Sequence, residues 1–369
     1  MKDVLIIGGG LAGLTSAIHL SKAGLQVILI EKKYYPLNKV CGEYISNEVL
    51  PYWHTLGIHP STLSPKEMTR FQLSSPSGKS IEKPLDLGGF SVRRYTLDEY
   101  LYQHVLQTDT EIHLNTTVQS IEYKDDFFAV MTTQGVIFEA KVVIGGYGKR
   151  SLIDKNLKRS FFQDRSYYIG VKQYFEMPFP DDLVALHNFE GGYCGVSKVE
   201  NDWVNVAYLT TKQSLQKYGT IDNLQQKALS SNPFLKEIFE LGKPVYEKPY
   251  VISNVSFQTK QQVCDHVLMC GDAAGMISPL CGNGMAMAIH SANIASEVVI
   301  DFLNGKISRT SMEERYKNEW NDLFKNRLFW GRHLQKFMGH SLVSEFSVRG
   351  LQWLPFLLNG IIRQTHGTN

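Results

Sequence analysis

The residues whose types and spacing suggest chemistry are two clusters of glycines, because closely spaced glycines let a backbone approach a ligand. The first is Gly8-Gly9-Gly10-Leu11-Ala12-Gly13, which contains the spacing G-x-G-x-x-G. The second extends from Gly271 to Gly284 and begins Gly271-Asp272. An acidic residue, Glu31, follows the first cluster at the interval typical of ribose recognition. This combination predicts chemistry on a bound dinucleotide, with the pyrophosphate at the glycines and a ribose at the acid.

The elements that must position the first cluster are predicted by its flanks. Val4–Ile7 is a short apolar run, as expected for a buried parallel strand. Apolar residues then recur at helical spacing, and Leu25–Ile30 forms a second apolar strand that ends at the acid. In such a unit Gly8 permits the tight turn, Gly10 lets the backbone approach the pyrophosphate, and Gly13 lets the helix pack closely on the strand.

The second cluster has a similar setting. Val267–Cys270 predicts a buried strand, and apolar and small residues run at helical spacing from Met285 to Val299. Asp272, at the strand end, can bind a ribityl hydroxyl, and a glycine loop that opens a helix offers N–H groups to a pyrimidine carbonyl or a phosphate. An ordinary strand–loop–helix turn is the alternative.

Further segments lie in the order and at the intervals found in one known family. They are Lys39-Val40-Cys41-Gly42-Glu43, Arg94-Tyr95-Thr96-Leu97-Asp98 and Thr117-Val118. Together with the glycine clusters, these segments resemble the superfamily of p-hydroxybenzoate hydroxylase and geranylgeranyl reductase, which are FAD-dependent oxidoreductases and monooxygenases. The resemblance covers most of residues 1–300 and favours FAD as the dinucleotide.

The resemblance implies an α/β fold in three parts. A Rossmann-like FAD-binding layer of the p-hydroxybenzoate hydroxylase type is expected from residues 1–65, 95–155 and 260–307. It would be interleaved with an antiparallel-sheet substrate domain from 66–94 and 156–259, and followed by a C-terminal helical cap over 308–369. The local pattern predicts one helical stretch over Tyr218–Leu241 and four strands over Ile169–Phe175, Leu183–Glu190, Tyr193–Val199 and Trp203–Leu209.

The resemblance also implies the site residues. Cys41, Tyr193 and Pro279 are expected beside the flavin ring as catalytic residues, and no metal ligands are expected. The residues expected to bind FAD are Gly8, Gly10, Leu11, Ala12, Gly13, Glu31, Lys32, Lys39, Cys41, Gly42, Arg94, Val118, Gly271, Asp272, Pro279, Gly282, Asn283, Gly284 and Met285.

Two departures from the family pattern bear on the reaction. Tyr147 stands where many hydroxylases carry the Asp of an Asp-Gly pair linked to both FAD and NAD(P)H, and the chain has no second G-x-G-x-x-G. NAD(P)H would then act as a transient reductant, or a partner protein would supply electrons. Tyr193 is retained from the reductase element Y-x-W-x-F-P, but Gly195 replaces its Trp. We expect this glycine to leave room beside the flavin for a larger substrate.

These features favour a monooxygenase that hydroxylates an apolar or aromatic small molecule through a flavin C4a-hydroperoxide. One alternative is a geranylgeranyl-reductase-like enzyme that saturates carbon–carbon double bonds, with Cys41 as the proton donor. Another is a flavin-binding electron-transfer or binding module without turnover. For Cys41 itself, a small buried residue at an FAD-binding backbone and a disulfide with Cys281 are further alternatives.

Composition excludes several other classes. The chain of 369 residues has 38 basic and 36 acidic side chains, and this near balance provides no field for nucleic acid. Five cysteines without a C-x-x-C pair indicate reduced thiols in a cytoplasmic protein. No apolar run reaches the length of about 18 residues expected of a membrane helix. The basic, aromatic C-terminal segment could contact an anionic membrane peripherally, although packing on the body of the protein is the favoured expectation.

Overall fold

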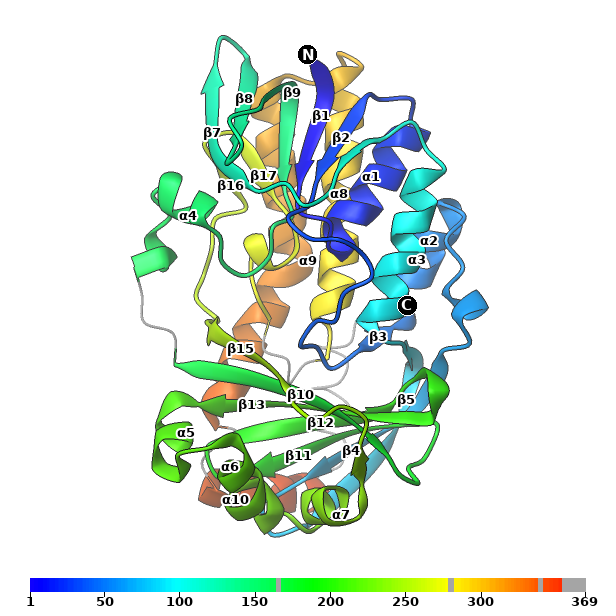
Figure 1. Ribbon diagram of the computed structural model, residues 1–369, viewed down its shortest axis with the longest axis vertical. Helices are drawn as coiled ribbons and strands as arrows, with labels where there is room; N and C mark the ends of the chain where they lie inside the picture. The colour runs from blue at the N-terminus through cyan, green and yellow to red at the C-terminus, as the bar shows by residue number, and fades with distance from the viewer. Residues whose placement is uncertain (164–166, 278–281, 338–340, 354–369) are drawn as a thin grey trace.

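The structure is a computed structural model that describes residues 1–163, 167–277, 282–337 and 341–353. Two sheets form its two layers, one above the other in Figure 1, and long helices run beside the first layer toward the second. The predicted α/β class with a separate second sheet is confirmed. That sheet is antiparallel except for one parallel pairing, between the strands Leu183–Phe189 and Lys66–Ser74.

The first sheet is built on five parallel strands in the order β17-β9-β1-β2-β6. Apolar runs form these strands because both faces of a parallel sheet are covered. A hairpin, β7–β8, extends the sheet from β9, and β16 pairs with β17. The bounds are β1 (Lys2–Ile7), β2 (Val27–Ile30), β6 (Glu111–His113), β7 (Val118–Lys124), β8 (Phe127–Thr132), β9 (Ile137–Gly145), β16 (Val263–Cys264) and β17 (Val267–Met269).

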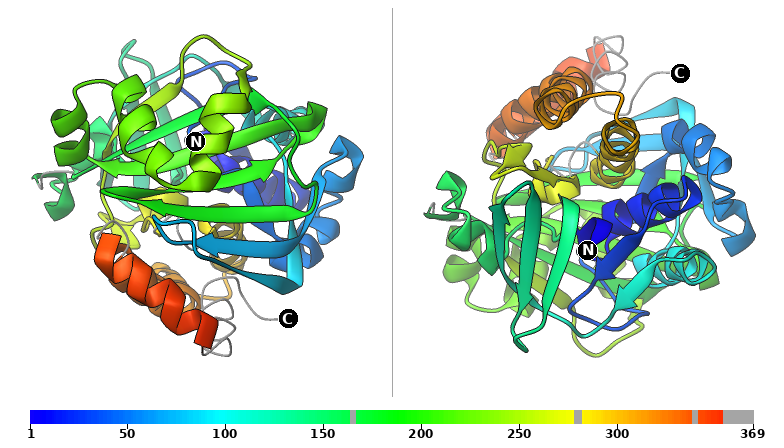
Figure 2. Two further views of the ribbon diagram at one scale, coloured as in Figure 1. Left: turned by 90° about the horizontal axis from the view of Figure 1, so that it is seen from below. Right: turned by 90° about the horizontal axis from the view of Figure 1, so that it is seen from above.

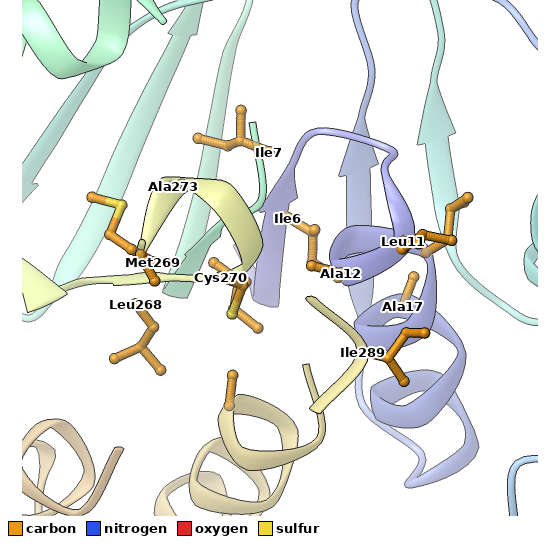
Figure 3. Packing of buried hydrophobic residues seen from close by; sticks show 14 of the residues in the cluster. Ile6, Ile7, Leu11, Ala12, Ala17, Leu268, Met269, Cys270, Ala273 and Ile289 are labelled. Carbon is orange, nitrogen blue, oxygen red and sulfur yellow. The ribbon is translucent and has the colours of Figure 1, made fainter. Parts of the chain in front are cut away.

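Helices α1 (Leu11–Lys22) and α8 (Gly284–Leu303) pack against each other beside this sheet, and α9 (Arg309–Phe337) packs on α8. Figure 3 shows the core where Ile6 of β1 lies between Ala12 of α1 and Cys270 after β17. Helix α3 (Arg94–Leu106) packs on α1, and two short helices are α2 (Leu50–Thr55) and α4 (Leu152–Asn156).

Among the described helices, α8 alone is long and apolar enough to span a membrane by composition. It contains no long uninterrupted apolar run, since small, polar and acidic residues separate the apolar ones. However, 56% of its apolar window is buried inside the protein, between α1 and α9. Such burial is typical of a core helix of a globular protein.

The second sheet has the order β14-β10-β13-β12-β11-β4-β5-β3, and β15 also pairs with β10. The four predicted strands correspond to β10 (Tyr168–Glu176), β11 (Leu183–Phe189), β12 (Gly192–Lys198) and β13 (Trp203–Thr211). The others are β3 (Tyr44–Ser46), β4 (Lys66–Ser74), β5 (Ser80–Ser91), β14 (Lys243–Pro244) and β15 (Tyr250–Val255). Strand β3 lies within residues 1–65, yet it pairs with β5 in this second sheet.

The single helical stretch predicted over Tyr218–Leu241 was wrong. Three helices, α5 (Lys212–Tyr218), α6 (Ile221–Lys227) and α7 (Pro233–Leu241), cover the outer face of the second sheet (Figure 2). The backbone of Gly219, at φ 82°, ends the first, and the hydroxyl of Thr220 caps the second. Asn232 caps the third, which begins at a proline that cannot continue a preceding helix.

The C-terminal segment is helical where it is described, in α9 and in α10 (Ser341–Trp353). Val348 of α10 is buried with Phe71 and Leu73 of β4. Trp320 and Phe324 of α9 are buried in the core of the first layer. Both helices therefore pack on the body of the protein.

Candidate functional site

A cavity of about 690 Å³ lies between the carboxyl ends of the parallel strands and the inner face of the second sheet. Strands β2 and β9 flank β1, and the chain leaves β1 toward β2, so the order of connections reverses beside β1. Ligands of open α/β sheets bind at such a point. The predicted site residues that line the cavity are Gly8, Gly10, Leu11, Ala12, Glu31, Lys32, Lys39, Cys41, Gly42, Arg94, Val118, Tyr193, Gly271, Asp272, Gly282, Gly284 and Met285.

At one end of the cavity, the first glycine cluster forms the turn from β1 into α1. Gly8 has a φ of 102°, which favours glycine, and Gly10 is the N-cap of α1 without a side-chain capping bond. The first N–H groups of α1 are therefore available to a ligand. An added Cβ at Gly10 would lie 3.7 Å from the Lys39 ammonium, so a cation stands close to the same turn. This geometry fits a pyrophosphate.

Glu31 ends β2 at the cavity wall and is held in place by the backbone. Its Oε2 accepts a hydrogen bond from the Gly9 N–H at 2.7 Å, and its Oε1 accepts one from the Lys33 N–H at 3.0 Å. Each carboxylate oxygen has a further lone pair, so the fixed side chain can still accept ribose hydroxyls.

Arg94 and Lys39 share one buried carboxylate. Asp98 accepts from Arg94 Nε at 2.6 Å and Nη2 at 2.8 Å, and its Oδ2 lies 2.8 Å from Lys39 Nζ. Burial opposes ionisation of Asp98, but the two cations hold the pKa of its carboxyl below the usual range. Two cations around one anion leave a net positive charge beside the cavity, as suits a phosphate-bearing ligand.

At the other end, the second glycine cluster forms the 3-10 turn η6 (Gly271–Ala273) and the start of α8. Asn283 is the N-cap of α8 and makes no side-chain capping bond, so this helix also presents N–H groups toward the cavity. Burial raises the pKa of the Asp272 carboxyl, which Lys260 partly opposes. The Lys260 ammonium donates to the carbonyls of Lys149 at 2.7 Å and Asp272 at 2.6 Å, and burial lowers its pKa to about 8.

The segment of residues 39–43 crosses the cavity between these two ends. The Cys41 sulfur accepts a hydrogen bond from the Glu43 N–H at 3.4 Å. Asn205 of β13 donates its amide to the carbonyl oxygens of Cys41, at 3.2 Å, and Gly42, at 2.9 Å. Burial raises the pKa of the Cys41 thiol, which is therefore protonated at neutral pH.

The second sheet supplies an apolar wall opposite this segment. Leu186, Tyr193, Gly195, Ala207 and Leu209 line the cavity from three adjacent strands. An added Cβ at Gly195 would meet only the Ala207 carbonyl oxygen, at 3.7 Å. Space for a larger group therefore exists beside Gly195.

Three predicted residues are not placed in the cavity wall. Gly13 lies in the α1–β1 contact, where an added Cβ would be 1.9 Å from the Gly8 carbonyl oxygen. The amide nitrogen of Asn283 donates to Glu48 Oε1 at 2.9 Å. Pro279, and Cys281 of the possible disulfide, lie outside the described residues, and Cys41 is a free cysteine.

Several polar residues at the site were missed by the sequence analysis. Lys172 and Tyr174 of β10 contact Glu43 beneath residues 39–43, and Asn205 holds the same segment. A lysine among the apolar and aromatic residues of this strand was the one available signal. The Tyr147 hydroxyl, in the position of the family's Asp, donates to Asp154 at 3.0 Å.

These observations match the shape and charge of FAD. Two helix N-termini without side-chain caps open on one cavity, an anchored acid lies at one end, and a buried acid lies at the other. Within the described residues, no group of three or more His, Cys, Asp or Glu side chains could hold a metal ion.

Comparison with known proteins agrees with the geometry. The family model described as FAD binding domain matches residues 1–325. The chain is 25% identical over 338 residues to digeranylgeranylglycerophospholipid reductase of Methanosarcina acetivorans, covering 87% of this chain and 80% of that protein. It is 24% identical over 365 residues to conditioned medium factor receptor 1 of Dictyostelium discoideum, covering 86% and 67%.

Solved structures show the same fold. The flavin-dependent brominase Bmp2 has a TM-score of 0.82 at 18% identity, with 99% of this chain and 93% of that chain covered. A geranylgeranyl bacteriochlorophyll reductase-like protein of Thermoplasma acidophilum has a TM-score of 0.76 at 20% identity, with 94% and 90% covered.

Proposed function

Since the chain belongs to the FAD binding domain family and is an FAD-dependent oxidoreductase, we propose that it saturates carbon–carbon double bonds in an apolar, prenyl-type substrate. The observation that carries this proposal is the position of the Cys41 thiol in the cavity wall, opposite an apolar surface. Burial, which raises the pKa of this thiol, suits it to hold a proton. The reductase activity named for the archaeal relatives supports the same choice.

The chemistry that FAD supplies, when bound and reduced by two electrons, would be hydride for one carbon of the double bond. The chain's own residues would do the remaining work. Leu186, Tyr193 and Leu209 would hold the apolar chain against the second sheet and keep water out. The Cys41 thiol would give its proton to the carbon that does not receive hydride, and the thiolate would regain a proton from solvent.

The test is anaerobic turnover of a geranylgeranyl lipid by the reduced, FAD-loaded protein, with the product measured by mass spectrometry. We expect a gain of two hydrogens per double bond and a loss of about 100-fold or more in kcat for Cys41→Ser. Cys264→Ser, at a half-buried cysteine outside the cavity wall, is the matched control and should retain turnover. No saturation by the wild-type protein would refute the proposal.

Hydroxylation of an apolar or aromatic molecule, which the sequence favours, is the second candidate. The open space beside Gly195 in the cavity wall supports it. This reaction requires oxygen and does not require an acidic thiol. Substrate-dependent oxygen consumption with an alkylated phenol, unaffected by Cys41→Ser, would establish it in place of reduction. Flavin binding without either turnover would favour an electron-transfer or binding module.

The remaining predictions about partners carry over as proposals. Electrons would come from transient NAD(P)H or from a reductant protein, in the cytoplasm. The packing of α9 and α10 on the body of the protein favours the role of a structural cap for these helices, rather than that of a membrane-binding segment.

A further inference from the structure

A fully buried ion pair joins Glu43, the last residue of the segment 39–43, to Lys172 of β10. Glu43 and Lys172 both have side chains that are 0% exposed, and Glu43 Oε1 lies 2.5 Å from Lys172 Nζ. Removing two charges from water costs several kcal/mol per ion, so such a pair persists only where further hydrogen bonds satisfy it.

The surrounding groups provide those bonds. Glu43 accepts from the Arg94 N–H at 2.7 Å and from the Tyr174 hydroxyl, which lies 2.9 Å from both carboxylate oxygens. Lys172 also donates to the carbonyl of Lys39 at 3.1 Å. The pair therefore bonds to both sides of the segment that carries Cys41.

The backbone at Glu43 is strained, which makes these bonds consequential. Glu43 has a φ of 59°, in the left-handed region that side chains other than glycine rarely adopt. Its N–H, in this conformation, donates to the Cys41 sulfur. The side-chain bonds of Glu43 thus hold the conformation that orients the thiol.

The sheet register connects the pair with the apolar wall. Lys172 pairs with Ala207, Ala207 with Gly195, and Gly195 with Leu186, so these four residues form one row across adjacent strands. Residues directly opposite each other share a face of a sheet. Lys172 therefore stands at one end of the row that lines the cavity.

We propose that Glu43 and Lys172 are positioning residues whose buried ion pair locks residues 39–43 to the second sheet and fixes where the Cys41 thiol points. The consequence for turnover rests on the proposed role of Cys41 as proton donor. The effect of the ion pair on the position of residues 39–43 does not depend on that role. The positioning by the ion pair and the proposed function can therefore be refuted separately.

The first experiment measures how well the ion pair holds the Cys41 thiol in place, through the rate at which that thiol is alkylated, and needs no enzymatic activity. Cys41 alkylation by iodoacetamide is followed by peptide mass spectrometry in the wild-type protein, Glu43→Gln, Lys172→Met and the double variant. We expect alkylation at least 10-fold faster in each folded variant. The double variant removes both charges, so it leaves no unpaired buried ion and is the one most certain to fold.

The matched control is Glu200→Gln. Glu200 is a carboxylate of similar size and 10% side-chain exposure, accepting from the Arg93 N–H at 2.9 Å and Nε at 2.7 Å. It joins the two layers without contacting residues 39–43, and alkylation should stay within about 2-fold of the wild type. Unchanged Cys41 reactivity in the folded double variant would overturn the proposal.

The second experiment separates positioning from mere stability. In FAD-loaded Lys172→Met and the double variant, kcat for saturation should fall at least 10-fold while KM changes less than 3-fold, and Lys172→Arg should restore part of it. Faster alkylation with unchanged kcat would refute the role in turnover. Faster alkylation when even the wild type saturates nothing would uphold the lock and refute the proposed function.

Discussion

Cys41 is the residue on which the proposed reduction differs from the alternative hydroxylation, because only reduction needs a proton donor that holds its proton at the working pH. Burial acts against the thiolate, since the charged form loses its water. The nearest cations, Arg94 and Lys172, act in the opposite direction but are outweighed. A thiol in this setting stays protonated at neutral pH and is a weak nucleophile.

The pH profile of saturation should follow this raised pKa. The active form is protonated, so kcat should be constant through neutral pH and decline as pH rises through the thiol pKa, which lies above its ordinary value of 9.0. Steady-state kcat between about pH 6 and 10 measures it. A decline already present between pH 6 and 8 would contradict a raised pKa. The residual activity of Cys41→Ser should lack this limb.

At the scale of elements, β12 determines the size of the apolar wall. Gly195→Leu should fill the space beside Ala207 and raise KM for a geranylgeranyl lipid at least 10-fold, because the new side chain occupies substrate volume. FAD affinity and melting temperature should stay near those of the wild type. Gly350→Leu, at an exposed glycine of α10 with open space around it, is the control. Equal KM values for both variants would place the substrate elsewhere.

A buried histidine lies where two strands of the second sheet meet the start of α7. His187 of β11 contacts the Ser74 hydroxyl of β4 at 2.8 Å, and Asn232, the cap of α7, donates to the same hydroxyl at 2.8 Å. Burial lowers the pKa of His187 to about 3. The folded state therefore disfavours its protonated form. The resulting stability is complete above the unfolded pKa of 6.5 and is lost as pH falls toward 3.

This linkage predicts acid sensitivity. Between pH 7.5 and pH 5 the free energy of unfolding should fall by about 2 kcal/mol through His187 alone. Urea unfolding of the wild type and His187→Gln measures it, and the variant should lose most of this pH dependence. His59→Gln, at an exposed histidine, should keep the wild-type dependence. An identical pH slope in all three proteins would contradict the assignment.

The elements were predictable from sequence where a local rule determines them. Apolar runs such as Val4–Ile7 and the glycine turns predicted the parallel strands and both ends of the cavity. Lys172 was not predictable as a site residue, because a lysine in a strand ordinarily faces solvent and only Glu43, 129 residues away, explains its burial. The pair Asn232-Pro233 is a recognisable signal for the start of a new helix. The apolar periodicity on either side of it nevertheless favoured one continuous helix.

At the scale of the whole molecule, a largely buried ion pair, here called the clamp, connects the C-terminal cap with the cavity. Glu48, 7% exposed, accepts from both terminal nitrogens of Arg327 of α9, at 2.9 and 3.0 Å. Its Oε1 also accepts from Asn283 at the start of α8. The position of α9 is thereby linked to the loop that presents N–H groups to the cavity.

Arg327→Met should loosen that loop. Because Glu48 would lose its arginine partner and keep the hydrogen bond from Asn283, we expect a loss of about 2–3 kcal/mol in unfolding free energy, somewhat below the ~3–5 kcal/mol of a fully buried pair. FAD affinity should fall as well, measured by recovery of flavin fluorescence on dilution. Arg315→Met, at a half-exposed arginine of the same helix whose ion pairs lie near the surface, should cost less than 1 kcal/mol and leave FAD affinity unchanged. Equal losses in both variants would exclude the clamp.

The strand order of the first sheet has a consequence for synthesis of the chain. Strand β1 is flanked by β2, close in sequence, and by β9, whose first residue is Ile137; the cavity lacks a wall until Gly284–Leu303 is in place. Closing such long loops slows folding. On the ribosome, the apolar edge of β1 therefore stays uncovered while more than a hundred residues are added. The cavity has both glycine turns in place only after most of the chain has emerged. We therefore expect cofactor capture to be a late event of biogenesis and the nascent apoprotein to be a candidate for chaperone binding.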